Sequence, residues 1–254
     1  MATLRTARER ARDEVNNEIL RVGREQLAEV GAAALSVRAV ARELGMVSSA
    51  IYRYVASRDE LLTRLIDAAY TSLGEAVEHD VEASADRAPA DRWVGAALVV
   101  RAWAIERPHE YALLYGSPVP GYAAPERTSV SGTRASRALI SIVRDATRTD
   151  AGDLVNSSRT ERRKSSRERG VGAGWSVESV VDPELVGDFV ELRASVDLDI
   201  DDDTLLDVVI AWTQLFGLVS FESFGQTRNL VQNHAALFES TARRTAQIIG
   251  LPDS

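Results

Sequence analysis

Apolar residues recur along this chain at the three- to four-residue spacing of amphipathic helices. This pattern predicts a first helix over residues 13–30, ended by Gly31, and a short helix that begins after the N-cap residue Ser36. The following stretch, residues 48–54, is long enough for only two helical turns. A capping-box pattern, Ser57 to Glu60, then opens a long helix. No run shows the two-residue alternation of a β-strand, so the expected fold class is all-α.

The helical pattern continues through the rest of the chain. Further helices are expected at about residues 90–107, 109–115, 133–147, 183–195, 203–224 and 232–249. Residues 116–125 are rich in proline and glycine and are expected to form a loop, and residues 156–174 lose the apolar period and are expected to form a mobile loop. The order of short and long helices around a glycine-containing turn is typical of a helix-turn-helix unit attached to a helical body. We therefore expect a helix-turn-helix domain over residues 1–60 and a larger helical domain over residues 61–254.

The formal net charge of −8 argues, by itself, against a nucleic-acid partner. The charge is unevenly distributed, however. Residues 1–64 contain 11 arginines against 9 acidic residues, a net charge of +2, and the rest of the chain carries −10. A mildly basic head on an acidic body suits a protein of which one end contacts phosphate groups.

Several classes of protein are disfavoured by composition. The chain has no cysteine, which excludes disulfides, thiolate nucleophiles and thiolate metal sites. The three histidines lack ligand spacing, the acidic stretch at residues 197–201 lacks the glycine and final glutamate of a calcium loop, and no nucleophile motif is present. We therefore expect no enzyme activity, no metal and no cofactor. No apolar run approaches the roughly 20 residues of a membrane span and the charged N-terminus has no signal-peptide core, so a soluble, cytoplasmic protein is expected.

The second helix of a helix-turn-helix lies in the major groove, with its first residues at the base edges. Ser48, Ser49 and Ala50 occupy these leading positions. Small residues let the helix approach closely, serine hydroxyls can donate or accept hydrogen bonds, and Ala50 can contact a thymine methyl group. For Ser48, a role as a helix N-cap is the alternative.

Side chains suited to phosphate lie next to these positions: Tyr52, Arg53, Tyr54 and Arg58. Arg38, in the preceding helix, is placed to reach a base edge or the backbone. Two alternatives stay open, because Tyr52 is also a candidate core residue and Arg38 a candidate solvated surface group. The apolar positions nearby are assigned to the core alone: Val37, Val40, Leu44, Ile51 and Val55.

Residues 35–62, LSVRAVARELGMVSSAIYRYVASRDELL, resemble the DNA-binding signature of the TetR family without a gap, within a likeness that covers about residues 13–65. The resemblance implies recognition by Ser48 to Ala50, phosphate contacts from Tyr52, Tyr54 and Arg58, and a base or backbone contact from Arg38. Tyr54, Val55 and Arg58 depart from the residues common in the family, which are His, Phe and Lys. The function implied is a ligand-responsive transcriptional repressor that binds a palindromic operator in double-stranded DNA as a dimer. The alternative is a ligand-independent architectural DNA-binding protein.

The body resembles a TetR subgroup marked by tryptophan and glycine, through residues 211–222, AWTQLFGLVSFE, and residues 106–118. The resemblance implies a homodimer through the last two long helices and a mostly apolar pocket for a small-molecule effector. The apolar stripes of those helices fit internal core equally well. The candidate pocket residues, which also fit ordinary core, are Trp93, Trp103, His109, Tyr111, Tyr115, Trp212 and Phe216. The basic stretch 159–169 is a second nucleic-acid contact or a solvated loop.

Overall fold

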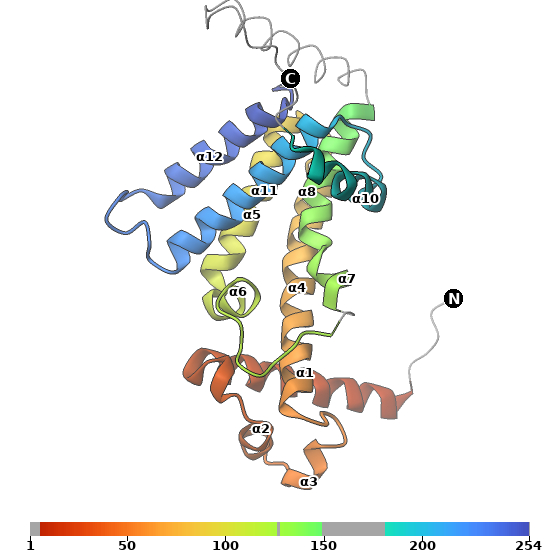
Figure 1. Ribbon diagram of the computed structural model, residues 1–254. Helices are drawn as coiled ribbons and strands as arrows, with labels where there is room; N and C mark the ends of the chain where they lie inside the picture. The colour runs from red at the N-terminus through yellow and green to blue at the C-terminus, as the bar shows by residue number, and fades with distance from the viewer. Residues whose placement is uncertain (1–5, 126–127, 149–180, 254) are drawn as a thin grey trace, which may run out of the picture. The chain divides into compact units, whose positions relative to one another are not determined.

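The computed structural model describes residues 6–125, 128–148 and 181–253, and over these residues it contains helices and no strands, which confirms the all-α fold (Figure 1). By contacts between Cα atoms the chain forms two compact units. The first unit comprises Met1–Ser72 and Glu106–Gly132, and the second comprises Leu73–Ile105 and Thr133–Ser254. The division expected at residue 60 is a division by function and stays a prediction. The stretches 156–174 and 159–169 lie outside the described residues.

The first unit holds the expected helix-turn-helix. Its elements are α1 (Ala7–Val30), the 3₁₀-helix η1 (Ala32–Ala34), α2 (Val37–Glu43), α3 (Ser48–Ile51), the first part of α4 (Arg58–Ala83), α6 (Pro108–Tyr115) and α7 (Thr128–Gly132). Helix α1 begins before the predicted residue 13 because Thr6 and Glu9 form a reciprocal capping box, with the Thr6 N–H donating to the Glu9 carboxylate at 2.8 Å. Helix α3 is shorter than predicted, and α7 was not predicted.

The turn between α2 and α3 depends on Gly45, which adopts the left-handed backbone conformation with φ 62°. Its N–H donates to the carbonyl of Arg42 at 3.1 Å, and the Met46 N–H donates to the carbonyl of Ala41 at 2.8 Å. These two bonds form a Schellman motif, which ends a helix and reverses the chain direction. Glycine fits because a Cβ atom would strain this conformation.

A single apolar core supports the helix-turn-helix. Residues from α1, α2, α3 and α4 are buried in it, among them Ile19, Val40, Ile51, Val55 and Leu61. The core assignments made from sequence are confirmed, although Leu44 is only partly buried. Partly buried side chains of α6 and of the segment after it pack against the same core: Leu113, Leu114, Val119 and Tyr122. The orientation of α3 is therefore fixed by packing.

The second unit holds the rest of α4, α5 (Pro89–Glu106), α8 (Arg134–Arg148), η2 (Pro183–Leu185), α10 (Val186–Val196), α11 (Asp202–Ser223) and α12 (His234–Ile249). Helices α11 and α12 pack side by side (Figure 1). Arg101 of α5 binds both carboxylate oxygens of Glu222 in α11, at 2.8 and 2.6 Å. Helix α8 lies so close to α4 that a Cβ atom on Gly74 would approach the Cβ of Arg134 to 2.6 Å.

Helix α11 is more apolar than its burial requires. Its most apolar 18-residue window has a mean hydropathy of 1.6 but is only 39% buried. By length and composition alone such a helix could cross a membrane, which is weak evidence because the core helix of a soluble protein passes the same test. Much of its apolar surface therefore lies outside the core of the single chain.

Candidate nucleic-acid interface

The recognition helix α3 is held on the core by one face and exposed on the other. Ile51 and Val55 are fully buried, whereas Ser48 and Ser49 are exposed and Ala50 is half-buried. The N-cap of α3 is Val47, so Ser48 does not cap the helix. Among the described residues neither serine hydroxyl has a hydrogen-bond partner. The three leading positions are thus available to an external ligand.

Two other predicted residues are also free of the core. The Tyr52 side chain is 43% exposed, which argues against the alternative that it mainly packs inside. Arg53 is exposed, and Tyr54 is half-buried against the core. The backbone carbonyl of Tyr54 accepts a hydrogen bond from Arg64 Nη2 at 2.6 Å, which ties the end of the recognition segment to α4.

Within the part of the first unit that the structure describes, the arginines divide into two groups. The paired group includes Arg21, bound to Glu18 and Glu25, and Arg24, which donates to Glu110 at 3.1 Å. The unpaired group is exposed and has no hydrogen bond or ion pair from its side chains to any described residue: Arg8, Arg12, Arg38, Arg42 and Arg53. The uncompensated positive charge therefore lies on the start of α1, on α2 and just after α3.

Arg8, Arg12 and Arg42 were not predicted as candidate site residues. The first two were missed because the first helix was expected to begin at residue 13, which left them outside any helical face. The spacing of Thr6 and Glu9 was the available signal, since it marks a capping box and places Arg8 and Arg12 one turn apart on one face.

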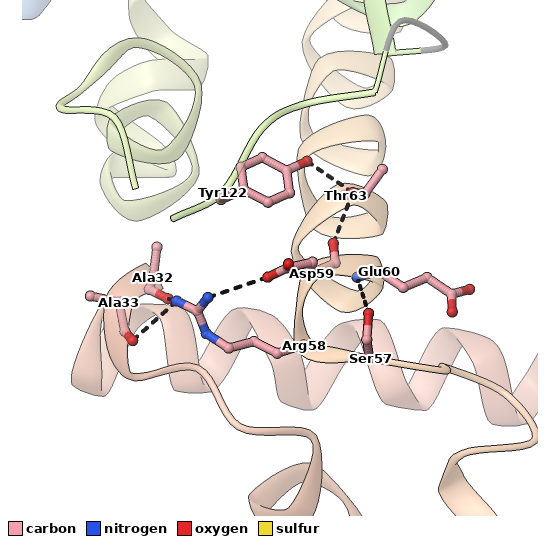
Figure 2. Close-up of polar contacts among 8 residues, drawn as sticks. All are labelled: Ala32, Ala33, Ser57, Arg58, Asp59, Glu60, Thr63 and Tyr122. Atoms are coloured by element: carbon pink, nitrogen blue, oxygen red, sulfur yellow. Dashed lines mark hydrogen bonds and ion pairs between the residues drawn. The ribbon is translucent and has the colours of Figure 1, made fainter. Parts of the chain in front are cut away.

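Arg58 has a structural role that the sequence did not predict (Figure 2). Its Nη2 donates to the carbonyls of Ala32 at 2.9 Å and Ala33 at 3.1 Å, and its Nη1 lies 3.4 Å from the Asp59 carboxylate. The side chain thereby ties the start of α4 to η1, the element that follows α1. Its predicted phosphate contact stays a prediction. Substituting Arg58 would not test that contact alone, because it would also remove the hydrogen bonds to Ala32 and Ala33.

The start of α4 is capped largely as predicted. The Glu60 N–H donates to Ser57 Oγ at 3.0 Å, which Figure 2 shows. The Glu60 carboxylate, however, accepts from the N–H of Ala56 at 2.6 Å, one residue before the expected partner, and also pairs with Arg64. Together with Arg58, these bonds fix the connection between α3 and α4.

We expect Arg58→Ala to lower the free energy of unfolding by about 1–2 kcal/mol, because two hydrogen bonds from a charged donor are lost at a half-buried position. Urea denaturation followed by circular dichroism measures the difference. Arg58→Lys is the matched control: it keeps the charge but lacks the fork that spans two carbonyls, so it should recover part of the loss. An alanine variant as stable as the original chain would show that these bonds do not stabilise the fold.

The predicted pocket residues fall in both units. In the second unit Trp93, Trp103 and Phe216 are buried and Trp212 is partly exposed. The ring centroids of Trp212 and Phe216 lie 5.3 Å apart. The indole N–H of Trp93 donates to Thr245 Oγ1 at 3.0 Å. Trp93 thus packs as a core residue that joins α5 to α12.

In the first unit Tyr111 is buried, Tyr115 is half-buried and His109 is exposed. The centroid of the Tyr115 ring lies 4.9 Å from that of Tyr111. It lies 6.2 Å from the ring centroid of Tyr70 in α4, and these two rings meet edge to face. Burial, followed by the neighbouring tyrosines, raises the pKa of the Tyr115 hydroxyl above its ordinary value, and burial raises that of Tyr70. Tyr70 was not predicted. A ligand-binding role for all seven candidates stays a prediction.

Two short helices around a glycine turn, with an exposed polar leading face on a buried core, define a helix-turn-helix DNA-binding protein. Comparisons with known proteins identify the family. Residues 19–65 match the family model of bacterial regulatory proteins, tetR family, and residues 93–245 match that of the tetracyclin repressor-like C-terminal domain. The HTH-type transcriptional regulators Rv1816 of Mycobacterium tuberculosis and Mb1846 of Mycobacterium bovis are each 35% identical to this chain over 245 residues, which cover 94% of both sequences. The chain therefore belongs to the TetR family.

Solved structures agree with this assignment. The crystal structure of regulatory protein SCO4313 has 29% sequence identity and a TM-score of 0.69, and the match covers 95% of this chain and 100% of that one. A protein of unknown function from Rhodococcus sp. RHA1, at 19% identity and a TM-score of 0.60 over 90% of this chain and 93% of that one, supports the fold alone. This chain is accordingly a transcriptional regulator of a family that binds DNA. Ligand binding and dimerisation are typical of the family.

Proposed function

We propose that this regulator is a ligand-responsive repressor that binds a palindromic operator as a homodimer, with α3 in the major groove. The observation that carries this proposal is the exposed leading face of α3, Ser48 to Ala50, on a fully buried support. Its hydroxyl and methyl groups suit base edges. The unpaired guanidinium groups of Arg38 and Arg53 can replace counterions on the phosphates, which gives affinity.

An exposed apolar stripe on α11 supports the dimer. Ile210, Gly217, Phe221 and Phe224 recur at the three- to four-residue spacing of one helical face, and the three large side chains are exposed in the single chain. Apart from its chain neighbours and the nearby backbone of α11 itself, no described atom lies within 4 Å of where a Cβ on Gly217 would stand, which leaves space for a second helix. Exposed apolar patches of this kind mark association surfaces. Two recognition helices about one DNA turn apart would read a palindrome.

A direct bond between the segment after α6 and α4 supports the ligand response (Figure 2). Thr63 Oγ1 donates its proton to the carbonyl of Asp59 at 2.8 Å, so the Tyr122 hydroxyl must donate to Thr63, also at 2.8 Å. Leu114 and Val119 pack on the same core as α3. A ligand that displaces α6 would therefore act on the start of α4, and through it on the recognition segment.

Tyr122→Phe is expected to lower the free energy of unfolding by about 1 kcal/mol, because Thr63 is only 3% exposed and loses a hydrogen bond that water cannot readily replace. Amide exchange in residues 117–125 should accelerate as well. Tyr52→Phe is the control, because that hydroxyl has no partner among the described residues and should be dispensable for folding. Equal stability of both variants would show that the bond does not hold the segment.

Selection of binding sites from a random pool of double-stranded DNA by the full chain, at two salt concentrations, tests the proposal. We expect one palindrome to be enriched, with an affinity that falls steeply as salt rises. Small molecules are then screened for release of, or tighter binding to, that DNA. Enrichment of no sequence would overturn operator recognition. A selected site that no compound affects would favour the ligand-independent alternative.

A further inference from the structure

A groove of about 600 Å³ lies in the first unit between the start of α1 and the segment after α3. Arg8, Arg12 and Val15 line it from α1, and Arg53 and Tyr54 line it from the recognition segment. The part contributed by Arg8 and Arg12 precedes residue 19, where the match to the tetR family model begins. The α1 side of the groove therefore lies outside the matched DNA-binding motif, whereas Arg53 and Tyr54 lie within it.

We propose that this groove binds the phosphate backbone of DNA beside the sequence that α3 reads. The inference rests on the proposed function. Only if α3 lies in the major groove of the DNA would this groove of the protein contact the phosphate backbone that flanks the recognised sequence. Three exposed guanidinium groups line it, and none has an ion pair or hydrogen bond to the residues that the structure describes. Guanidinium groups bind phosphate oxygens through charge-assisted, often paired, hydrogen bonds.

The local geometry favours an anion over a cation. Glu9, the carboxylate on the groove, is already bound to the N–H of Thr6 in the capping box, so it does not neutralise the arginines by direct pairing. Arg8 and Arg12 stand one turn apart on α1, about 6 Å along its axis, and therefore share a face. Arg53 approaches the same groove from the recognition segment.

DNA is favoured as the source of the anion because the charge continues beyond the groove. Arg38 and Arg42 of α2 are also exposed and unpaired with described residues, so α1, α2 and the segment after α3 all carry uncompensated positive side chains. An extended polyanion can contact arginines on several elements at once, whereas a free phosphate would occupy the groove alone.

The double variant Arg8→Ala/Arg12→Ala, in the full chain, tests the inference by titration with the selected duplex and with an unrelated duplex of equal length. We expect affinity to fall by about 10-fold or more for both duplexes. The slope of log affinity against log salt concentration should decrease in magnitude by about two for each protomer, one for each arginine removed. The order of preference among DNA sequences should not change. Arg8→Lys/Arg12→Lys should restore most of the slope, because the charge is kept.

The control variant Arg137→Ala/Arg244→Ala removes the same charge from exposed positions on α8 and α12 that have no partner among the described residues. It should keep the original slope. Trimming the base pairs that flank the selected site should abolish the difference between the original chain and the Arg8/Arg12 variant.

The outcomes separate the two proposals. If the original chain binds no duplex, operator recognition fails and the groove assignment fails with it. If the original chain binds but the Arg8/Arg12 variant matches the control in affinity and slope, the groove assignment alone is overturned. A changed sequence preference would mean that these arginines read bases, and an unchanged duplex affinity with weakened binding of inorganic phosphate would mean a small-anion site. Either result also overturns the backbone assignment.

Discussion

The double variant Arg38→Ala/Tyr52→Ala is expected to bind the selected operator at least 100-fold more weakly than the original chain while folding normally. Both side chains are exposed and have no partner among the described residues, so their removal should change the free energy of unfolding by less than about 0.5 kcal/mol. Each contact with a base or phosphate contributes about 1–2 kcal/mol, so two lost contacts on each of two heads correspond to a factor of roughly 1000 or more if they add fully, and the expected 100-fold is a lower bound. Fluorescence anisotropy with labelled operator measures the loss.

Leu230→Ala/Arg244→Ala is the matched control, since it removes one large exposed apolar side chain and one unpaired arginine from the second unit. It should retain full affinity. Arg38 is preferred to Arg58 for this experiment because Arg58 holds η1 against α4. A substitution of Arg58 would lower the stability of the fold as well as the affinity for DNA, so the two effects could not be separated. Undiminished operator binding by the Arg38/Tyr52 variant would remove α2 and α3 from the DNA interface.

The helices were predictable wherever an apolar stripe packs on a core. Ile51 and Val55 are fully buried as their spacing indicated, and Gly45 makes the predicted turn. The first turns of α1 have no such stripe. The start of α1 is fixed by the capping box between Thr6 and Glu9. This is a local polar pattern, and the spacing of apolar residues does not reveal it. Because the helix was predicted to begin at residue 13, Arg8 and Arg12 were not recognised as candidate site residues.

The polar contacts around the candidate site were not predictable from local patterns. Arg58 bonds to a carbonyl 26 residues away, and Tyr122 bonds to a hydroxyl 59 residues away. Sequence spacing specifies neighbours on one helix but not partners brought together by tertiary packing. For the same reason it did not distinguish the paired Arg24, bound to Glu110 of α6, from the unpaired Arg12 on the same helix.

Phe221→Glu is expected to convert the proposed dimer to monomers, with a dissociation constant raised at least 100-fold. The Phe221 side chain is 55% exposed in the single chain, so the substitution costs the monomer little. In a two-fold interface through α11 each substitution acts twice and places an unpaired carboxylate in an apolar contact, which costs several kcal/mol. Operator affinity should fall as well, because two linked heads bind far more tightly than one.

Sedimentation velocity over a range of concentrations measures the oligomeric state. Leu230→Glu is the control: it places the same charge on a 78% exposed apolar residue of the α11–α12 connection, off the stripe, and should leave the dimer unchanged. If the Phe221 variant stays dimeric at the original dissociation constant, the α11 stripe does not form the interface. The exposed apolar surface of α11 would then require a different partner, because solvent exposure of Ile210, Phe221 and Phe224 together is unfavourable for an isolated chain.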